Sequence, residues 1–446
     1  MIINIPVDVE KIINRLEERG FEAYAVGGCI RDSLMDSKPN DWDICTSAQP
    51  EQVINCFEDY HVIETGVKHG TVTVRLNGQS YEITTYRIDG EYLDNRRPEN
   101  VQFVNSIQED LARRDFTMNA MAYNSGKGLV DYYKGCNDLK DGIIRCVGKA
   151  DERFKEDALR IIRALRFASV FGFTIEKETS ESIHHNKNLI KNIAKERINV
   201  ELCKLLSGKG VKEILKNYSD ILSVMIPEIK PMIGFQQNNP HHKYDVWEHT
   251  IAAVENSVSE PIIRLAVLLH DIGKPECYTC DGRGIGHFYS HGEFGAKIAE
   301  KILRDLKFDN QTISDVCQLI KYHDADISEN SKFIKKWLNK IGIVQFERLL
   351  LVKQADVMGQ SDYLKEKKLK TLANIQSTMS KILEEKQCFT LKQLAVNGND
   401  LIKIGIHDGK IIGEILNWLL EQVMENQLEN KKDTLIIAAK KIIIEL

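Results

Sequence analysis

The spacing of apolar positions along the chain changes near residue 150. Before that point, short runs rich in β-branched residues alternate with Gly, Asn and Asp turns, as at 71–74 and 81–86, and this pattern predicts β-strands. Helical spacing appears in this part at 7–19. From about Asp151 onward, apolar residues recur every three or four positions and the β signals fade. The pattern therefore predicts an α+β fold, with a small sheet in an N-terminal head and an all-helical remainder.

Four segments follow from the same pattern. We expect a head over residues 1–135, a helical neck over 136–230, a His-rich helical block over 240–365 and a helical tail over 380–446. The stretch between the neck and the His-rich block contains several Pro, Gly and Asn residues, which is typical of a linker.

Composition narrows the class of protein without fixing it. The chain has 446 residues with 60 basic and 65 acidic side chains, a net charge of −5. This balance excludes a uniformly basic coat but leaves room for a local basic face that binds nucleic acid. The ten cysteines are scattered, as in reduced cytoplasmic proteins. No apolar run reaches the roughly 18 residues of a membrane span, so we expect a cytoplasmic protein without a membrane partner.

Two carboxylates two positions apart, Asp41 and Asp43, are the first candidates for chemistry. On a strand this spacing points both side chains to one face, where their oxygens can hold one or two Mg²⁺ ions. Glu82 alternates correctly in its own run to supply a third carboxylate from a neighbouring strand. The plainer interpretation is a surface Asp-x-Asp turn and a solvated Glu.

Glycines and arginines nearby suit a phosphate chain. A Gly-Gly pair at 27–28 stands between an expected strand and an expected helix, where backbone N–H groups can approach a phosphate closely. Arg31 adds a charge beside it. The octet 113–120 holds two arginines, an acid and an amide, and paired arginines suit triphosphate oxygens. Farther on, Asp157 and Arg160 stand at i and i+3, which on spacing alone favours a simple helical ion pair.

A second set of chemical residues lies in the His-rich block. A His-Asp pair at 270–271 follows an apolar run, and further histidines and an aspartate lie before and after it. Histidine and carboxylate together bind transition metals, and a metal-bound water can hydrolyse phosphate esters. Lys274, one turn past the pair, is placed to steady a phosphate.

The first set resembles the class II tRNA nucleotidyltransferases, the CCA-adding enzymes and their bacterial poly(A) polymerase relatives. The matching stretches are 27–32, 41–43, 70–74, 82–87, 113–120, 156–160 and 195–198, in the family's order. The resemblance implies a polymerase-β-like head in which Mg²⁺ is held by Asp41 and Asp43, with Glu82. It implies nucleotide binding by Gly27, Gly28, Arg31, Arg114, Asp115, Asn119, Asp157, Arg160 and Arg163.

The resemblance also gives Asp157 and Arg160 a role that spacing does not. In the family these residues read the Watson–Crick edge of the incoming CTP or ATP. An acid accepts from the exocyclic amine that C and A share, and Arg donates to ring acceptors. Guanine and uracil lack an amine at that position and would leave the acid unpaired. The segment 89–101 matches the family's mobile loop, with Arg97 where relatives often carry His.

The second set resembles the HD superfamily of metal-dependent phosphohydrolases. By motif match its core metal ligands are His249, His270, Asp271 and Asp356, and His291 and His323 match the additional ligands of dinuclear members. We expect a divalent transition metal or Mg²⁺ there. The tail resembles the domain of bacterial CCA-adding enzymes that contacts the tRNA elbow. Residues 141–220 carry 16 basic and 12 acidic residues, a local excess where the family's neck grips the acceptor stem.

We therefore predict a CCA-adding tRNA nucleotidyltransferase that uses CTP, ATP and the tRNA 3′ end without a nucleic-acid template. The nearest alternative is an A-adding enzyme or a poly(A) polymerase, which shares these motifs. An alternative of another class is an HD phosphohydrolase that acts on nucleotides or RNA ends, with the head serving recognition. A catalytically silent RNA-binding module is a third, and it conflicts with two complete carboxylate sets.

Overall fold

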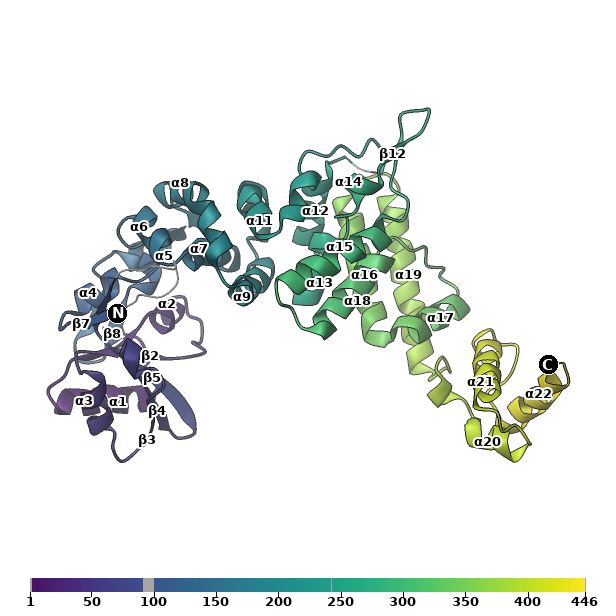
Figure 1. The fold of residues 1–446 in the computed structure, drawn as a ribbon, viewed down its shortest axis with the longest axis horizontal. Helices are drawn as coiled ribbons and strands as arrows, with labels where there is room; N and C mark the ends of the chain where they lie inside the picture. Colours follow the sequence, from purple (N-terminus) through teal and green to yellow (C-terminus); the bar gives the residue numbers. More distant parts are fainter. Residues whose placement is uncertain (1, 91–99, 242, 446) are drawn as a thin grey trace. The chain divides into compact units, whose positions relative to one another are not determined.

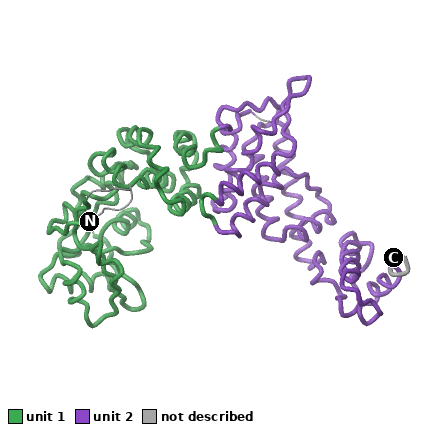
Figure 2. The backbone as a smooth tube through the Cα atoms, viewed as in Figure 1, with its two compact units in different colours: residues 1–230, 305–308 green, residues 231–304, 309–446 purple. Residues whose placement is uncertain are grey.

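A computed structural model of the chain describes residues 2–90, 100–241 and 243–445 (Figure 1). The chain forms two compact units (Figure 2). Unit 1 comprises Met1–Lys230 with Asp305–Phe308, and unit 2 comprises Pro231–Arg304 with Asp309–Leu446. Within the described ranges, no helix is both long and apolar enough to cross a membrane.

Unit 1 contains a seven-stranded sheet in the order β3-β4-β5-β2-β1-β8-β9. Its strands are β1 (Ala23–Val26), β2 (Asp43–Thr46), β3 (His61–Ile63), β4 (Thr71–Leu76), β5 (Gln79–Thr85), β8 (Ala122–Asn124) and β9 (Gly128–Val130). Strands β2 and β5 run parallel and the other neighbours are antiparallel.

Both faces of this sheet are covered at β1 and β2. On one face, Ala23, Ala25 and Ile44 pack with the apolar sides of α1 (Val7–Glu18) and α3 (Pro50–Cys56). On the other, Tyr24 and Cys45 pack with Leu111 of α4 (Ile107–Ala112). The pleat sends successive side chains of β1 and β2 to opposite faces, so nearly all of them are buried. The central strand β2, which begins at Asp43, is thereby held by core on both sides.

The helices that follow the sheet complete unit 1. They are α2 (Gly28–Leu34), α5 (Gly135–Asp141), α6 (Ala150–Glu156), α7 (Leu159–Phe171), α8 (Lys177–Asn186), α9 (Lys195–Leu206), α10 (Val211–Asn217) and α11 (Ser219–Met225). Helix α7 packs against α9 and ends at Gly172, whose φ of 64° suits glycine at a helix C-terminus.

The expected all-helical neck is wrong in one detail. Strands β10 (Ile143–Ile144) and β11 (Thr174–Ile175) pair in parallel across α6 and α7. Two paired residues are too short to leave a period-2 signal in the sequence, so the helical pattern masked them. Another short pair, β6 (Arg87–Asp89) and β7 (Val101–Phe103), brackets part of the expected mobile loop. Residues 91–99 of that loop lie outside the described chain.

Unit 2 is helical apart from a small hairpin, β12 (Thr279–Cys280) and β13 (Gly286–His287). Its helices are α12 (Val246–Asn256), α13 (Pro261–Leu269), α14 (Lys274–Cys277), α15 (His291–Asp305), α16 (Asn310–Tyr322), α17 (Ser331–Ile341), α18 (Ile343–Gly359), α19 (Lys365–Glu384), α20 (Gly398–Lys403), α21 (Gly409–Met424) and α22 (Lys432–Glu445). Nearly every side chain of α13 is buried, and α13 packs against α12, α16 and α18. The predicted α+β class, with the sheet at the N-terminal end and helices after it, is confirmed.

Candidate functional sites

A polar cavity of about 480 Å³ opens in unit 1. The turn after β1, the start of β2, the segment after α4 and the first half of α7 form its walls. Its lining residues are Gly27, Gly28, Arg31, Asp41, Asp43, Arg113, Arg114, Asp115, Asn119, Asp157, Arg160, Arg163, Arg166 and Phe167. All the residues predicted for nucleotide and Mg²⁺ binding in the head and neck thus line this cavity, except Glu82.

The turn at Gly27 brings the backbone close to the side chain of Arg114. Gly27 has φ of 83°, a conformation that glycine adopts without strain. A Cβ on Gly27 would lie 2.9 Å from Nη1 of Arg114. A larger residue would therefore both strain the turn and push that guanidinium away. The turn, the arginine and the open cavity together leave space for a phosphate group.

The carboxylates gather around the start of β2. Asp43 begins β2, and the parallel register of Ile44 with Ile83 places Asp43 beside Glu82 on the same face. Asp41 precedes the strand rather than lying on it. The expected shared strand face is therefore wrong for Asp41, because the chain turns into β2 only at Asp43. Asp41 and Asp43 nevertheless line the same cavity.

The electrostatics of Asp43 fit a metal ligand. Burial, together with the charges of Asp41 and Glu82, raises the pKa of its carboxyl to about 6 against the opposing effect of Arg114. Three acids that repel one another around an open cavity favour a divalent cation, because the cation removes the repulsion. This donor set of carboxylate oxygens fits Mg²⁺.

The cavity arginines are anchored by buried acids. Asp110 is fully buried and accepts from Arg113 Nη2 at 2.7 Å and from Arg114 Nη2 at 3.3 Å. The Arg113 and Arg114 charges hold the pKa of Asp110 below its ordinary value although burial alone would raise it. The anchoring leaves the Arg114 guanidinium with further N–H groups, since Arg carries five.

A chain of hydrogen bonds joins α2 to α7 across the cavity. Arg31 Nη1 donates to Asn119 Oδ1 at 2.7 Å, and Asn119 Nδ2 donates to Asp115 Oδ1 at 3.0 Å. Asp115 Oδ2 then accepts from Arg163 Nε at 2.9 Å and Nη2 at 2.6 Å. Although burial opposes it, the Arg163 charge and these bonds lower the pKa of Asp115 to about 2. Asp115 and Asn119 thereby fix the orientation of two cavity arginines.

Asp157 and Arg160 do not share a helix face, which corrects that expectation. Asp157 has φ of −130° and ψ of 103° and separates α6 from α7. Its Oδ1 accepts from the N–H of Leu159 at 3.0 Å, so it starts the next helix. Arg160 pairs with Glu156 at 2.7 Å and donates to the carbonyl of Arg113 at 2.9 Å. The two side chains thus bond to other partners rather than to each other, yet both line the cavity.

Several residues of the site were not predicted. Arg166 and Phe167 line the cavity. Arg197 and Glu201 of α9 form hydrogen bonds with cavity residues. Glu201 Oε2 accepts from Arg166 Nε at 2.9 Å. The spacing of Arg160, Arg163 and Phe167 along one helix face carried a signal, whereas the α9 contacts depend on packing between helices far apart in sequence.

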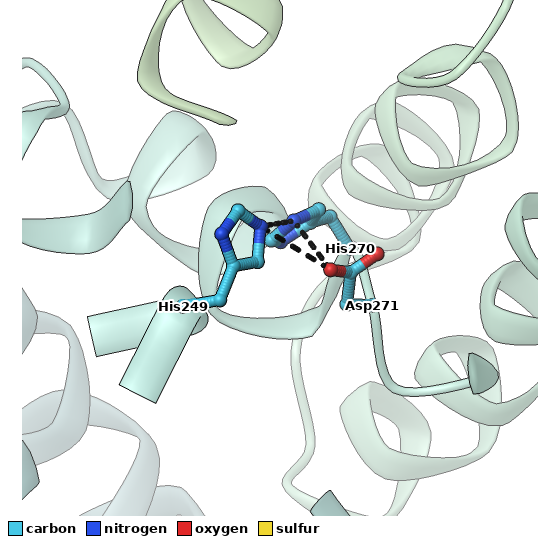
Figure 3. A group of neighbouring side chains, drawn as sticks. All are labelled: His249, His270 and Asp271. Atoms are coloured by element: carbon cyan, nitrogen blue, oxygen red, sulfur yellow. Dashed lines mark hydrogen bonds and ion pairs between the residues drawn. The ribbon is translucent and has the colours of Figure 1, made fainter. Parts of the chain in front are cut away.

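The six metal-ligand candidates of unit 2 converge on one buried centre. His249 comes from α12, His270 and Asp271 follow α13, and the others come from α15, α16 and α18. Figure 3 shows His249, His270 and Asp271 with their ring nitrogens and carboxylate facing one another. His249 Nε2 lies 3.2 Å from His270 Nε2 and 3.0 Å from Asp356 Oδ1.

Asp271 is shared between two groups of ligands. Its Oδ2 lies 3.3 Å from His249 Nε2 and 3.1 Å from His270 Nε2. Its Oδ1 lies 3.4 Å from His291 Nε2 and 3.6 Å from His323 Nε2. In each group of three, the ligand atoms lie within 4.8 Å of one another. A carboxylate that offers one oxygen to each group suits a bridge between two ions.

The protonation of the rings fits metal binding. The Nδ1 atoms of His270, His291 and His323 lie 2.7 Å from the carbonyls of Val267, Phe288 and Ile320 respectively. A carbonyl only accepts, so each Nδ1 carries a proton and Nε2 is the ring nitrogen that faces the centre. Both carboxylate oxygens of Asp271 are buried and accept no regular hydrogen bond from the described chain, although Lys274 Nζ lies 2.7 Å from Oδ2. The donor set therefore fits divalent metal ions.

Family models match three stretches of the chain. The Poly A polymerase head domain matches residues 23–145, and the probable RNA and SrmB-binding site of polymerase A matches residues 172–233. A putative tRNA nucleotidyltransferase domain 2 matches residues 291–439. The first model covers the cavity residues up to Asn119.

Whole-length relatives agree with these matches. The CCA-adding enzyme of Ligilactobacillus salivarius is 34% identical over 100% of this chain and 99% of its own length. That of Bacillus velezensis is 32% identical over 94% of each chain. The solved CCA-adding enzyme of Bacillus stearothermophilus in complex with CTP superposes with a TM-score of 0.69 at 26% identity, covering 97% of this chain and 95% of the other. The chain belongs to the CCA-adding enzyme family, a group of nucleotidyltransferases.

Proposed function

We propose that this protein adds C, C and A to the 3′ end of tRNA from CTP and ATP without a nucleic-acid template. The observation that carries the proposal is one cavity that gathers two acids for Mg²⁺, a set of arginines and the Asp157–Arg160 pair. Whole-length similarity to CCA-adding enzymes supports it. The Thermotoga maritima CCA-adding enzyme, which shares this fold, has been solved in complex with tRNA.

In this proposal the tRNA 3′-hydroxyl attacks the α-phosphate of the bound nucleotide. A bond forms between the 3′-oxygen and phosphorus, the bond to the β-phosphate oxygen breaks, and pyrophosphate leaves with the hydroxyl proton released. Asp41, Asp43 and Glu82 would hold Mg²⁺, which stabilises the charge that develops on the phosphate. Arg31 and Arg114 orient the triphosphate by charge-assisted hydrogen bonds.

The base is selected at the entrance to α7. Asp157 accepts from the exocyclic amine of cytosine or adenine, and Arg160 donates to a ring acceptor. Uracil offers no amine to the Asp157 carboxylate, and loss of that base contact costs about 1–3 kcal/mol of discrimination. A single pair of side chains thus accepts both correct bases and rejects the others.

The decisive experiment measures the mass of the product formed from each of three forms of one tRNA. The purified protein would receive Mg²⁺ with CTP, ATP or both, and tRNA ending at the discriminator base, at C or at CC. We expect C, C and A on the first form and then a stop. A single A added only to the CC-ended form would make this an A-adding enzyme. Long A tails would make it a poly(A) polymerase.

The proposed activity takes place in the cytoplasm, on tRNA held by the neck over 136–230 and the tail over 380–446. Sequence resemblance and the family match to an RNA-binding segment at 172–233 support this division. Binding through backbone phosphates weakens as salt rises. Tail deletion at about residue 380 should therefore raise the KM for tRNA while leaving that for CTP unchanged.

A second activity, hydrolysis of phosphate esters by the HD block over 240–365, is supported by the bridging position of Asp271. Two ligand groups that share one carboxylate suit a pair of ions, and a pair of ions can activate water and hold a phosphate. Metal content by mass spectrometry tests the centre, and release of phosphate from a 3′-phosphorylated RNA end, or opening of a 2′,3′-cyclic end to a phosphomonoester, tests the reaction. A chain without bound metal would refute this second activity and leave the first intact.

A further inference from the structure

Two cavities meet at the proposed metal centre of unit 2. One, of about 290 Å³, is polar and reaches Asp271, Lys274 and His291. The other, of about 360 Å³, extends toward α19; we call it the side pocket. His323, Asp324, Asp356 and Gln360 line both, so a ligand at the metal centre can extend from one cavity into the other.

The side pocket has walls of mixed character. Its apolar part consists of Ile327, Val357, Leu364, Leu372 and Ile375. Lys353, Lys367 and Lys368 add cations to the same walls, and Asp324 and Asp326 add acids. Specific sites for small organic ligands combine apolar walls with a few placed polar groups. Phosphate alone would use the cations but gain nothing from the apolar side.

The side pocket is also connected to the metal centre by hydrogen bonds. Lys368 Nζ donates to Gln360 Oε1 at 2.6 Å, and Gln360 Nε2 donates to Asp356 at 3.0 and 3.1 Å. Lys353 Nζ donates to the carbonyls of His323 and Ala325 at 2.7 and 2.8 Å. The cations of the pocket therefore hold two of the metal-ligand candidates in place.

We propose that the side pocket binds the nucleoside part of a phosphate ester whose phosphate lies at the metal centre. The apolar wall covers a base face, the acids accept from its exocyclic amines, and the lysines face its phosphates. The ligand is a nucleoside phosphate, either free or at the end of an RNA chain. This inference rests on the proposed second activity and assigns its substrate recognition in part to α19, outside the 240–365 block.

The test measures binding to the full-length protein loaded with Mn²⁺. The probe is the AMP analogue with CH₂ in place of the ester oxygen, which cannot be hydrolysed, and methylphosphonate is its anion control. We expect the analogue to bind at least tenfold more tightly than methylphosphonate. Thr371→Trp should fill the pocket and remove that advantage, whereas Ser377→Trp, at an exposed position of the same helix, should keep it.

A matched pair of charge-reversing variants on α19 tests the contribution of the pocket lysines. Lys367→Glu should weaken binding of the analogue several-fold, and Lys370→Glu, exposed and outside the pocket lining, should not. Any binding of the analogue to the cavity of unit 1 is common to all variants and cancels in the comparison. An RNA trinucleotide with a 3′-phosphate, used as competitor, distinguishes an RNA end from a free nucleotide as the source.

The outcomes separate the two proposals. If the chain takes up no Mn²⁺, the hydrolase proposal fails and this inference fails with it. If Mn²⁺ and methylphosphonate bind but the analogue shows no advantage, or Thr371→Trp behaves as Ser377→Trp does, the side pocket is refuted while the metal centre stands.

Discussion

Arg197 Nη2 lies 3.0 Å from Asp157 Oδ2, and Nη1 of the same guanidinium lies 3.4 Å from Oδ1. A planar guanidinium that faces both oxygens fixes a carboxylate in direction as well as position. Asp157 also accepts from the N–H of Leu159, so the group proposed to read the base is held from two elements. Arg197 therefore positions the carboxylate that is proposed to select the base.

Replacing Arg197 should lower the discrimination between nucleotides more than the rate of nucleotide addition. We expect Arg197→Ala to lower the ratio of CTP to UTP incorporation by about tenfold or more, because a loosely held Asp157 loses part of the roughly 1–3 kcal/mol of discrimination that a good pair supplies. Arg197→Lys should restore it in part. Single-turnover incorporation with each nucleotide gives the ratio, and Glu196→Ala, exposed on the same helix, is the control. Equal losses for CTP and UTP would argue for a merely structural role.

Asp157→Asn keeps the shape of the side chain and exchanges an acceptor for a donor. The amide can donate to the O4 of uracil, so we expect CTP and ATP to lose about 10- to 100-fold in kcat/KM, while UTP gains or stays unchanged. Product sequencing with all four nucleotides measures this. A variant that still rejects UTP as the wild type does would remove Asp157 from base selection.

Mg²⁺ binding to the unit 1 cavity should depend on pH near 6. Because burial and the neighbouring acids raise the pKa of Asp43 to about 6, a proton must leave before the carboxylate can bind the ion. At pH 5 only about one in ten Asp43 side chains is ionised, so the apparent Mg²⁺ affinity should fall about tenfold per pH unit below 6 and level off above 7. Mn²⁺ titration followed by electron paramagnetic resonance checks this, and Asp43→Asn should abolish the dependence together with activity.

Asp115→Asn should destabilise unit 1 by about 2 kcal/mol at pH 7. The pKa of Asp115 is lowered to about 2 from 3.8. The stabilisation is therefore fully present above pH 4 and is lost as the pH falls from 4 toward 2. Urea unfolding across this range should show the gap between variant and wild type closing with acid. Asp141→Asn, at an exposed position of α5, should show no such gap at pH 7.

Removal of the shared carboxylate should empty both proposed metal positions of unit 2. Asp271→Asn loses the oxygen charge that both ligand groups use, so metal content should drop for both together rather than by half. Asp281→Asn, on the exposed hairpin, is the control and should retain its metal. Nucleotide addition by the Asp271 variant should continue, since the unit 1 cavity contains none of these ligands. A chain that keeps half its metal would contradict the bridge.

The sequence predicted the residues of the two sites better than the contacts among them. Asp41, Asp43 and the arginines of 113–120 were recognisable because each occurs in a short motif with a fixed interval. The break at Asp157 was not, because a helical pattern runs through it and only the Leu159 N–H contact shows the restart. The Arg197 and Glu201 contacts depend on how α9 packs against α7, which the periodicity of either helix does not encode.

The Nδ1 protons of His270, His291 and His323 are already committed to backbone carbonyls in the folded chain. The Nε2 atoms therefore face the centre before any ion arrives. A preformed set of imidazole and carboxylate ligands binds divalent ions with affinities that generally rise in the order Mn²⁺, Fe²⁺, Co²⁺, Ni²⁺, Cu²⁺, with Zn²⁺ below copper. The ion found in this centre after purification would then report the metal supply of the cell as much as a preference of the chain.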